Sequence, residues 1–125
     1  MKRFLIIVCC FSIVLIGWSK KGINSKTVYK KGDIEITLQA VRDGRCPVDM
    51  MCWWPGNAEV DLKIIKEGQA IDFTLNTGGP VYGRLFNKDT TLFGKQITLI
   101  ALEPYPDTRK KVKFKRYEVT LEVTD

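Results

Sequence analysis

The sequence has 125 residues, of which 45% are hydrophobic and 27% are charged, with 20 basic and 14 acidic side chains. This length allows one domain with a modest core. The net charge of +6 is too small to indicate a nucleic-acid-binding protein, and the lack of histidine excludes histidine-based catalytic triads and the usual histidine-bearing zinc sites.

Residues 1–19 have the features of a secretory signal peptide. A short basic start is followed by an apolar run from Phe4 to Gly17 and by a small-residue cleavage position that ends at Ser19. The run is shorter than the roughly 20 residues of a membrane-spanning helix. We therefore expect residues 20–125 to form a single exported β-domain, periplasmic or secreted and monomeric. Membrane anchoring through an uncleaved leader is the alternative.

From Lys26 onward, apolar residues recur at every second position, which is the period of half-buried β-strands. A turn is expected at residues 87–90, between Leu85-Phe86 and Leu92-Phe93. The pattern predicts an all-β fold, an antiparallel β-sandwich of about seven strands that is immunoglobulin-like in size, with a small β-barrel as the alternative. The expected strands run near residues 28–31, 34–40, 58–64, 71–76, 95–103 and 117–123.

The same alternation predicts which side chains form the core. Segment 95–103 carries apolar residues on both phases, which indicates a central strand covered on both faces. The apolar phase changes near residues 115–116, which predicts a β-bulge. The expected core residues are Ile36, Leu38, Val60, Leu62, Phe73, Leu99, Val119 and Leu121.

Cys46 and Cys52 are the only cysteines outside the leader. An even pair in an exported chain predicts a disulfide, which would hold the loop between two strands. Met50 and Met51 could join two thiolates in a Cu(I) site, but the spacing is not that of a CxxC redox motif. We expect the structural disulfide, with no metal and no cofactor.

Two tryptophans follow the second cysteine of this loop. Neighbouring residues of an extended chain face opposite sides. Trp54 shares its phase with Ala58 and is expected to be buried against the disulfide. Trp53 is then the candidate contact residue, together with Met50 and Met51, because an exposed aromatic side chain can bind a sugar or a protein partner.

The segment 109–116 contains six basic residues. Lysines on an edge strand prevent sheets from pairing, and this is the preferred interpretation. The alternative is weak attraction to an anionic envelope surface, membrane or polymer. The six residues are Arg109, Lys110, Lys111, Lys113, Lys115 and Arg116.

Arg45-Cys46-Pro47, followed by Cys52 and by a tryptophan before Gly56-Asn57-Ala58-x-Val60, resembles the pattern of an uncharacterised family of small exported bacterial proteins and lipoproteins. The segment 102–106 and the strand that follows are also similar to that family. Trp18 stands where lipoprotein members carry the lipidated cysteine. The resemblance implies a β-rich envelope or secreted protein and no known activity.

These observations together predict an exported, non-enzymatic binding module of the cell envelope or extracellular space, which presents a disulfide-held aromatic loop. Its expected partner is an envelope protein or a glycan, and not a nucleic acid. Two alternatives remain open. One is a purely structural envelope protein, and the other is a small hydrolase whose carboxylates meet only in the folded chain.

Overall fold

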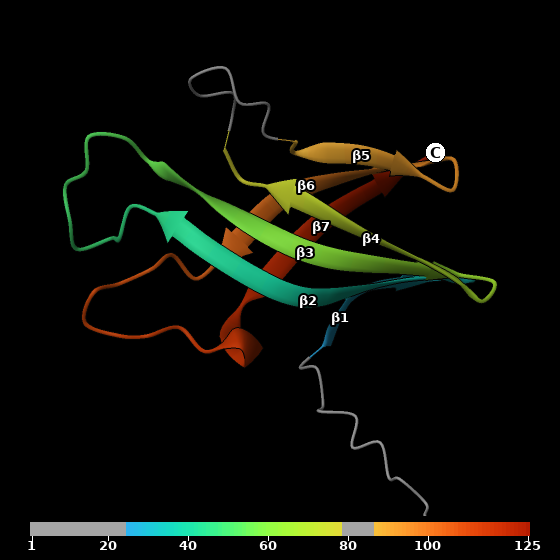
Figure 1. The fold of residues 1–125 in the computed structure, drawn as a ribbon, viewed down its shortest axis with the longest axis horizontal. Helices are drawn as coiled ribbons and strands as arrows, with labels where there is room; N and C mark the ends of the chain where they lie inside the picture. Colours follow the sequence, from blue (N-terminus) through green and yellow to red (C-terminus); the bar gives the residue numbers. More distant parts are fainter. Residues whose placement is uncertain (1–24, 79–86) are drawn as a thin grey trace, which may run out of the picture.

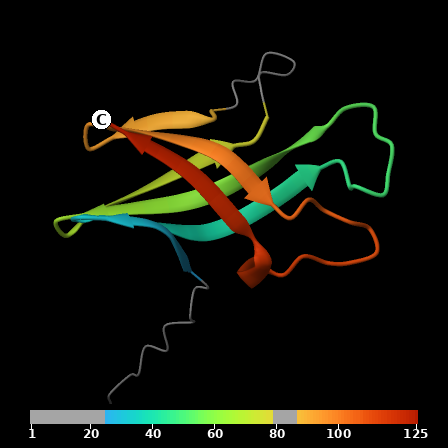
Figure 2. The same ribbon diagram turned by 180° about the vertical axis from the view of Figure 1, so that it is seen from behind.

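The computed structural model describes residues 25–78 and 87–125, so the predicted leader lies outside the described residues. Seven strands form two antiparallel sheets that face each other as the layers of a sandwich (Figure 1, Figure 2). The predicted β-sandwich is confirmed, and the alternative of a small barrel is wrong because the described sheets remain separate. The first sheet contains β1 (Lys26–Lys31), β2 (Ile34–Arg45), β3 (Gly56–Lys66) and β4 (Gln69–Asn76), and the second contains β5 (Asp89–Leu92), β6 (Lys95–Glu103) and β7 (Glu118–Thr124).

In both sheets the strands lie side by side in the order of the chain, β1-β2-β3-β4 and β5-β6-β7. An immunoglobulin domain, in contrast, interleaves strands from distant parts of its sequence. Tight turns explain the sequential order here. Between β3 and β4, Glu67 and Gly68 both have positive φ angles (48° and 77°), as the two-residue hairpin turns that suit the twist of paired strands require.

The prediction of a turn at residues 87–90 is wrong for residues 89 and 90. Asp89 and Thr90 begin β5 and pair with Thr98 and Ile97 of β6. The turn lies instead after Leu92, where β5 ends and a tight connection leads into β6. Leu85 and Phe86, the residues expected before this turn, lie outside the described residues.

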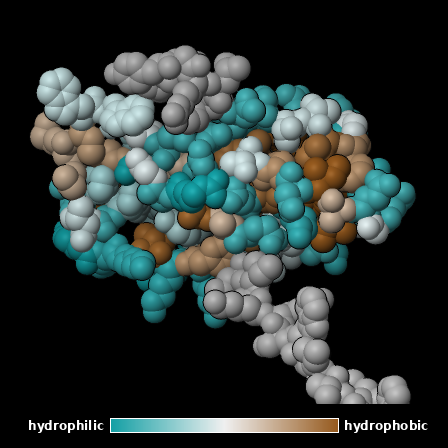
Figure 3. Space-filling model, viewed as in Figure 1, coloured by the Kyte–Doolittle hydropathy of each residue, from teal (hydrophilic) through white to brown (hydrophobic). Residues whose placement is uncertain are grey.

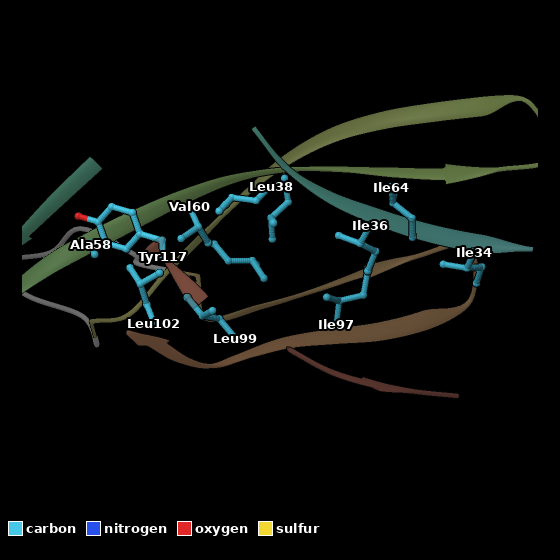
Figure 4. Close-up of a cluster of buried hydrophobic side chains, with 12 residues drawn as sticks. Ile34, Ile36, Leu38, Ala58, Val60, Ile64, Ile97, Leu99, Leu102 and Tyr117 are labelled. Carbon is cyan, nitrogen blue, oxygen red and sulfur yellow. The ribbon is translucent and has the colours of Figure 1, made fainter. Parts of the chain in front are cut away.

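The hydrophobic core lies between the two sheets (Figure 4). Five of the eight predicted core residues are fully buried. Phe73, Val119 and Leu121 are only partly buried, because β4 and β7 are edge strands that the opposite sheet does not cover completely. The buried apolar residues are Ile34, Ile36, Leu38, Ala58, Val60, Leu62, Ile64, Leu75, Ile97, Leu99, Leu102 and Tyr117.

A β-bulge in β2 changes which side chains face the core. Leu38 pairs with Leu62 of β3, but the next pair joins Ala40 to Asp61, so Gln39 has no partner. Even-numbered residues face the core before this point, and odd-numbered residues face it afterwards. As a result, β2 continues past the predicted end at residue 40 and turns Asp43 and Arg45 inward.

A second bulge lies in β6, which is the central strand of its sheet as predicted. The register shifts between Leu99 and Ala101, so Leu102 becomes buried (2% exposed) while Ile100 points outward (51% exposed). The prediction that this strand is covered on both faces is therefore wrong. The bulge expected near residues 115–116 is also wrong, because a short 3₁₀ turn, η1 (Phe114–Arg116), changes the phase there instead.

Candidate functional site

The loop from Cys46 to Pro55 joins the ends of β2 and β3 and is held at its root. Cys46 and Cys52 form the predicted disulfide, with their Cα atoms 5.9 Å apart. The amide of Cys46 donates a hydrogen bond to the carbonyl oxygen of Pro55 at 2.8 Å. Gly56 has a φ of 73°, and a Cβ atom there would come within 2.2 Å of the Gly44 carbonyl oxygen, so the root of the loop requires glycine.

The outer part of this loop is apolar and exposed to solvent. Met51 and Trp53 are fully exposed, and Val48 and Met50 are more than half exposed. At the left of Figure 3, the same end of the molecule is tan and pale where its surroundings are teal. An apolar loop with this exposure offers contact area that the domain's own core does not use.

The expectation that Trp54 is buried against the disulfide is wrong, since its side chain is 49% exposed. The argument from alternation fails because β3 begins at Gly56, where the positive φ angle interrupts the extended chain. Trp53 is exposed as expected. Both tryptophans therefore lie at the surface of the loop, together with Met50 and Met51.

The loop starts from a buried polar cluster that the sequence analysis missed. Arg45 is 6% exposed and forms a two-point ion pair with Asp43, in which its Nε and Nη2 atoms each lie 2.8 Å from a carboxylate oxygen. The same guanidinium donates to the carbonyl oxygens of Leu102 (2.6 Å) and Pro104 (2.9 Å). It also stacks on the ring of Tyr105, with its central carbon 4.1 Å from the ring centroid.

Burial alone would raise the pKa of Asp43, but the hydrogen bonds and charge of Arg45 outweigh it and lower this pKa below its usual value of 3.8. The hydroxyl of Tyr117 also donates to Asp43, at 3.2 Å. Burial raises the pKa of Tyr117, and the nearby carboxylate adds to this effect. Cys46 follows Arg45 directly, so this cluster fixes where the disulfide loop leaves the sandwich.

The segment that follows β6 packs against the disulfide loop. The amide of Val48 donates to the carbonyl oxygen of Pro106 at 2.9 Å. The carboxylate of Asp49 accepts hydrogen bonds from the amide of Thr108, at 3.0 Å, and from its hydroxyl. In Figure 1 and Figure 2 the two loops lie at the same end of the sandwich.

The six basic residues of segment 109–116 are all exposed, and they do not lie on a strand. They occupy a loop and the 3₁₀ turn η1, which end where β7 begins. The interpretation that they protect an edge strand is therefore wrong. Within the described chain, Arg109 pairs with Asp107, whose pKa falls to about 2 because the guanidinium donates to its carboxylate.

A groove of about 830 Å³ lies between this basic segment and the disulfide loop. Apolar side chains from both loops and from the Pro104-Tyr105 segment form part of its wall, while four cations and three carboxylates, those of Glu103, Asp107 and Glu118, line the remainder. Among the residues that line it are Val48, Tyr105, Lys110, Lys111, Lys115 and Arg116. The tertiary structure thus brings the aromatic loop and the basic segment, which the sequence separates, to one site.

The copper alternative has no structural support, because the disulfide uses both cysteines as a covalent pair. In residues 25–78 and 87–125, no group of three or more Cys, Asp or Glu side chains is arranged to hold a metal ion. The same ranges contain no helix with the length and apolar character needed to cross a bilayer.

Comparisons with models of protein families, with curated proteins and with solved structures gave no match to this chain. The resemblance to a family of small exported proteins therefore stays a prediction.

Proposed function

We propose that this protein is an exported, non-enzymatic binding module of the cell envelope or extracellular space, and that it acts through the disulfide loop. The observation that carries the proposal is the full exposure of Trp53 on a loop whose root is fixed. A soluble domain gains no stability from a solvated tryptophan, whereas a binding surface uses such side chains as anchors.

The rigidity of the loop supports a role in binding. The disulfide, the hydrogen bond from Cys46 to Pro55 and the contacts of Val48 and Asp49 with the neighbouring segment hold the loop before any partner arrives. A preorganised loop loses little conformational entropy when it binds. The sequence contains no histidine, and one of the three carboxylates that line the groove, that of Asp107, is held in an ion pair with Arg109. Both observations favour binding over hydrolysis by paired carboxylates.

The test measures binding of the labelled protein to envelope preparations from its own cells. Trp53→Ala should reduce binding by at least about tenfold, the effect of losing one interface anchor. The matched control is Ile71→Ala, which removes an exposed apolar side chain from the edge strand β4 and should leave binding unchanged. If the two variants bind as the wild type does, the loop is a structural element and the proposal is wrong.

A further inference from the structure

The disulfide loop ends in a tip without charge. From Met50 to Pro55 the chain carries no charged side chain, and Asp49, the nearest acidic residue, is held by hydrogen bonds to Thr108. The tip extends beyond the ends of β2 and β3 (Figure 1). Tryptophan and methionine side chains at such a tip can enter the boundary between lipid headgroups and acyl chains, where the amphipathic indole ring is favoured.

Cations without acidic partners lie at the same end of the molecule. Within the described residues, none of Lys110, Lys111, Lys115 and Arg116 forms an ion pair. They line the groove beside Val48 of the disulfide loop. Arg42 and Arg109 are paired with carboxylates, whereas the exposed Lys30 and Lys31 form no ion pair within the described residues either. Of the three carboxylates that also line the groove, that of Asp107 is paired with Arg109, so four cations face only those of Glu103 and Glu118. The groove therefore keeps an excess of positive charge for an anionic ligand.

We propose that this end of the protein docks on a membrane that contains anionic phospholipids. Trp53, Trp54 and Met51 enter the interface, while the groove cations contact the phosphate groups of the lipids. This inference rests on the proposed function, since it names the partner of the same loop. Apolar insertion and charge attraction are each weak alone, and stable attachment of a peripheral protein takes both signals together.

The shape of the tip favours a membrane over a folded protein partner. Met51 and Trp53 are fully exposed, so a protein would have to supply a matching pocket for each of them. A fluid lipid interface closes around a protruding side chain of any shape. The groove beside Val48, at the base of the tip, places the cations on the side of the loop that headgroups would contact once the tip is inserted.

The test uses the emission of Trp53 in the full chain. Only three tryptophans occur in the sequence, so Trp18→Phe combined with Trp54→Phe leaves Trp53 as the single fluorophore. The probe is a vesicle of phosphatidylglycerol and phosphatidylcholine whose acyl chains carry bromine, a short-range quencher. We expect a blue shift and strong quenching with these vesicles, and little of either with phosphatidylcholine alone or in high salt. Anchoring through the leader does not mimic this signal, because quenching requires Trp53 itself to reach the acyl chains.

Two pairs of lysine substitutions then test the role of the groove. Lys110→Gln combined with Lys111→Gln should weaken binding to the anionic vesicles by about 30-fold. Each basic residue close to the membrane surface contributes about fivefold to the affinity, and the two contributions multiply. The control, Lys30→Gln with Lys31→Gln, removes the same charge near the start of β2, away from the disulfide loop, and should change binding by less than about threefold.

Three results would overturn the inference. Equal effects of the two pairs of lysine substitutions would show that the groove does not contact headgroups. Equal quenching by neutral vesicles would show that insertion of Trp53 does not require anionic lipid. No quenching in any vesicle, combined with loss of envelope binding in Trp53→Ala, would assign the loop to a protein or glycan. In that last case the proposed function stands and only the membrane inference fails.

Discussion

Arg45 and Asp43 lie two residues apart on β2 and form an ion pair that is buried between the two sheets. Hydrogen bonds from the same guanidinium to the end of β6 make this pair a link between the sheets. Because no buried side-chain nitrogen or oxygen in the described chain lacks a partner, the cost of burying both charges is offset by a full set of hydrogen bonds.

The first prediction compares two arginines on one strand. Arg45→Met should lower the free energy of unfolding by about 3–5 kcal/mol, because it leaves Asp43 buried and unpaired. Arg42 is also paired with carboxylates, those of Glu59 and Asp61, but its side chain is exposed. Arg42→Met should therefore cost less than about 1 kcal/mol. Urea unfolding of both variants provides the measurement, and equal losses would contradict the assigned role of Arg45.

The second prediction concerns acid. The pKa of Asp43 is lower in the folded protein than its ordinary value of 3.8, so the folded state holds its charged form more strongly than the unfolded chain does. The resulting stabilisation is complete above about pH 4 and is lost as the pH falls through the lower, folded-state pKa. Asp61 shifts in the same direction because Arg42 donates to its carboxylate.

Urea midpoints at about pH 7 and about pH 3 test this acid dependence. The wild type should lose stability at the lower pH, while Asp43→Asn should lose less, because its side chain no longer takes up a proton. We expect Asp43→Asn to be less stable than the wild type at neutral pH, because it loses the ion pair with Arg45, so the change in midpoint between the two pH values is the quantity to compare. An unchanged difference would show that Asp43 does not contribute to acid unfolding.

The third prediction tests the bulge in β6. Leu102→Ala should cost about 2–5 kcal/mol of unfolding free energy, since the side chain is buried between the sheets. Ile100→Ala removes a similar apolar side chain two residues away, but from the solvent-facing side, and should cost less than about 1 kcal/mol. Similar losses for the two variants in urea melts would mean that the strand runs without the bulge, because residues 100 and 102 would then face the same side.

The fourth prediction is that the disulfide stabilises the domain modestly. Replacing Cys46 and Cys52 together by serine should lower the unfolding free energy by about 2 kcal/mol. The loss is small because a disulfide that closes a short loop removes little conformational entropy from the unfolded chain. Wild-type protein with added reductant is the control and should lose a similar amount. Alkylation of both thiols in the absence of reductant would contradict the pairing.

The fifth prediction is that the exported protein begins near Lys20. The basic start, the apolar run and the small-residue site at residues 17–19 are the grounds for it. Intact mass spectrometry of the protein recovered outside the cytoplasm gives the answer directly. A mass that retains Met1 would favour the alternative of a membrane anchor formed by the leader.

The alternation of apolar and polar residues determined most of the strands and the sandwich class. It failed wherever the backbone inserted one residue, because a bulge reverses the facing of every side chain beyond it. For this reason Ile100 and Leu102, which alternation places on one face, lie on opposite faces, and Asp43 and Arg45 were not recognised as buried. The regular phase shared by Val41, Asp43 and Arg45 was the one local signal that could have indicated the polar cluster.

The cysteine count, with the predicted leader, was enough to predict the disulfide, and with it the loop that carries Trp53. Only the tertiary structure decided that both tryptophans are exposed and that the basic segment lines a groove with Val48 of the same loop. Val48 and Asp49 lie more than fifty residues from Pro106 and Thr108, and the hydrogen bonds that join these residues form only once both sheets are in place. Local periodicity specifies strands, because it depends on neighbouring residues. Contacts between distant loops depend on how the two sheets pack, which no local pattern in the sequence records.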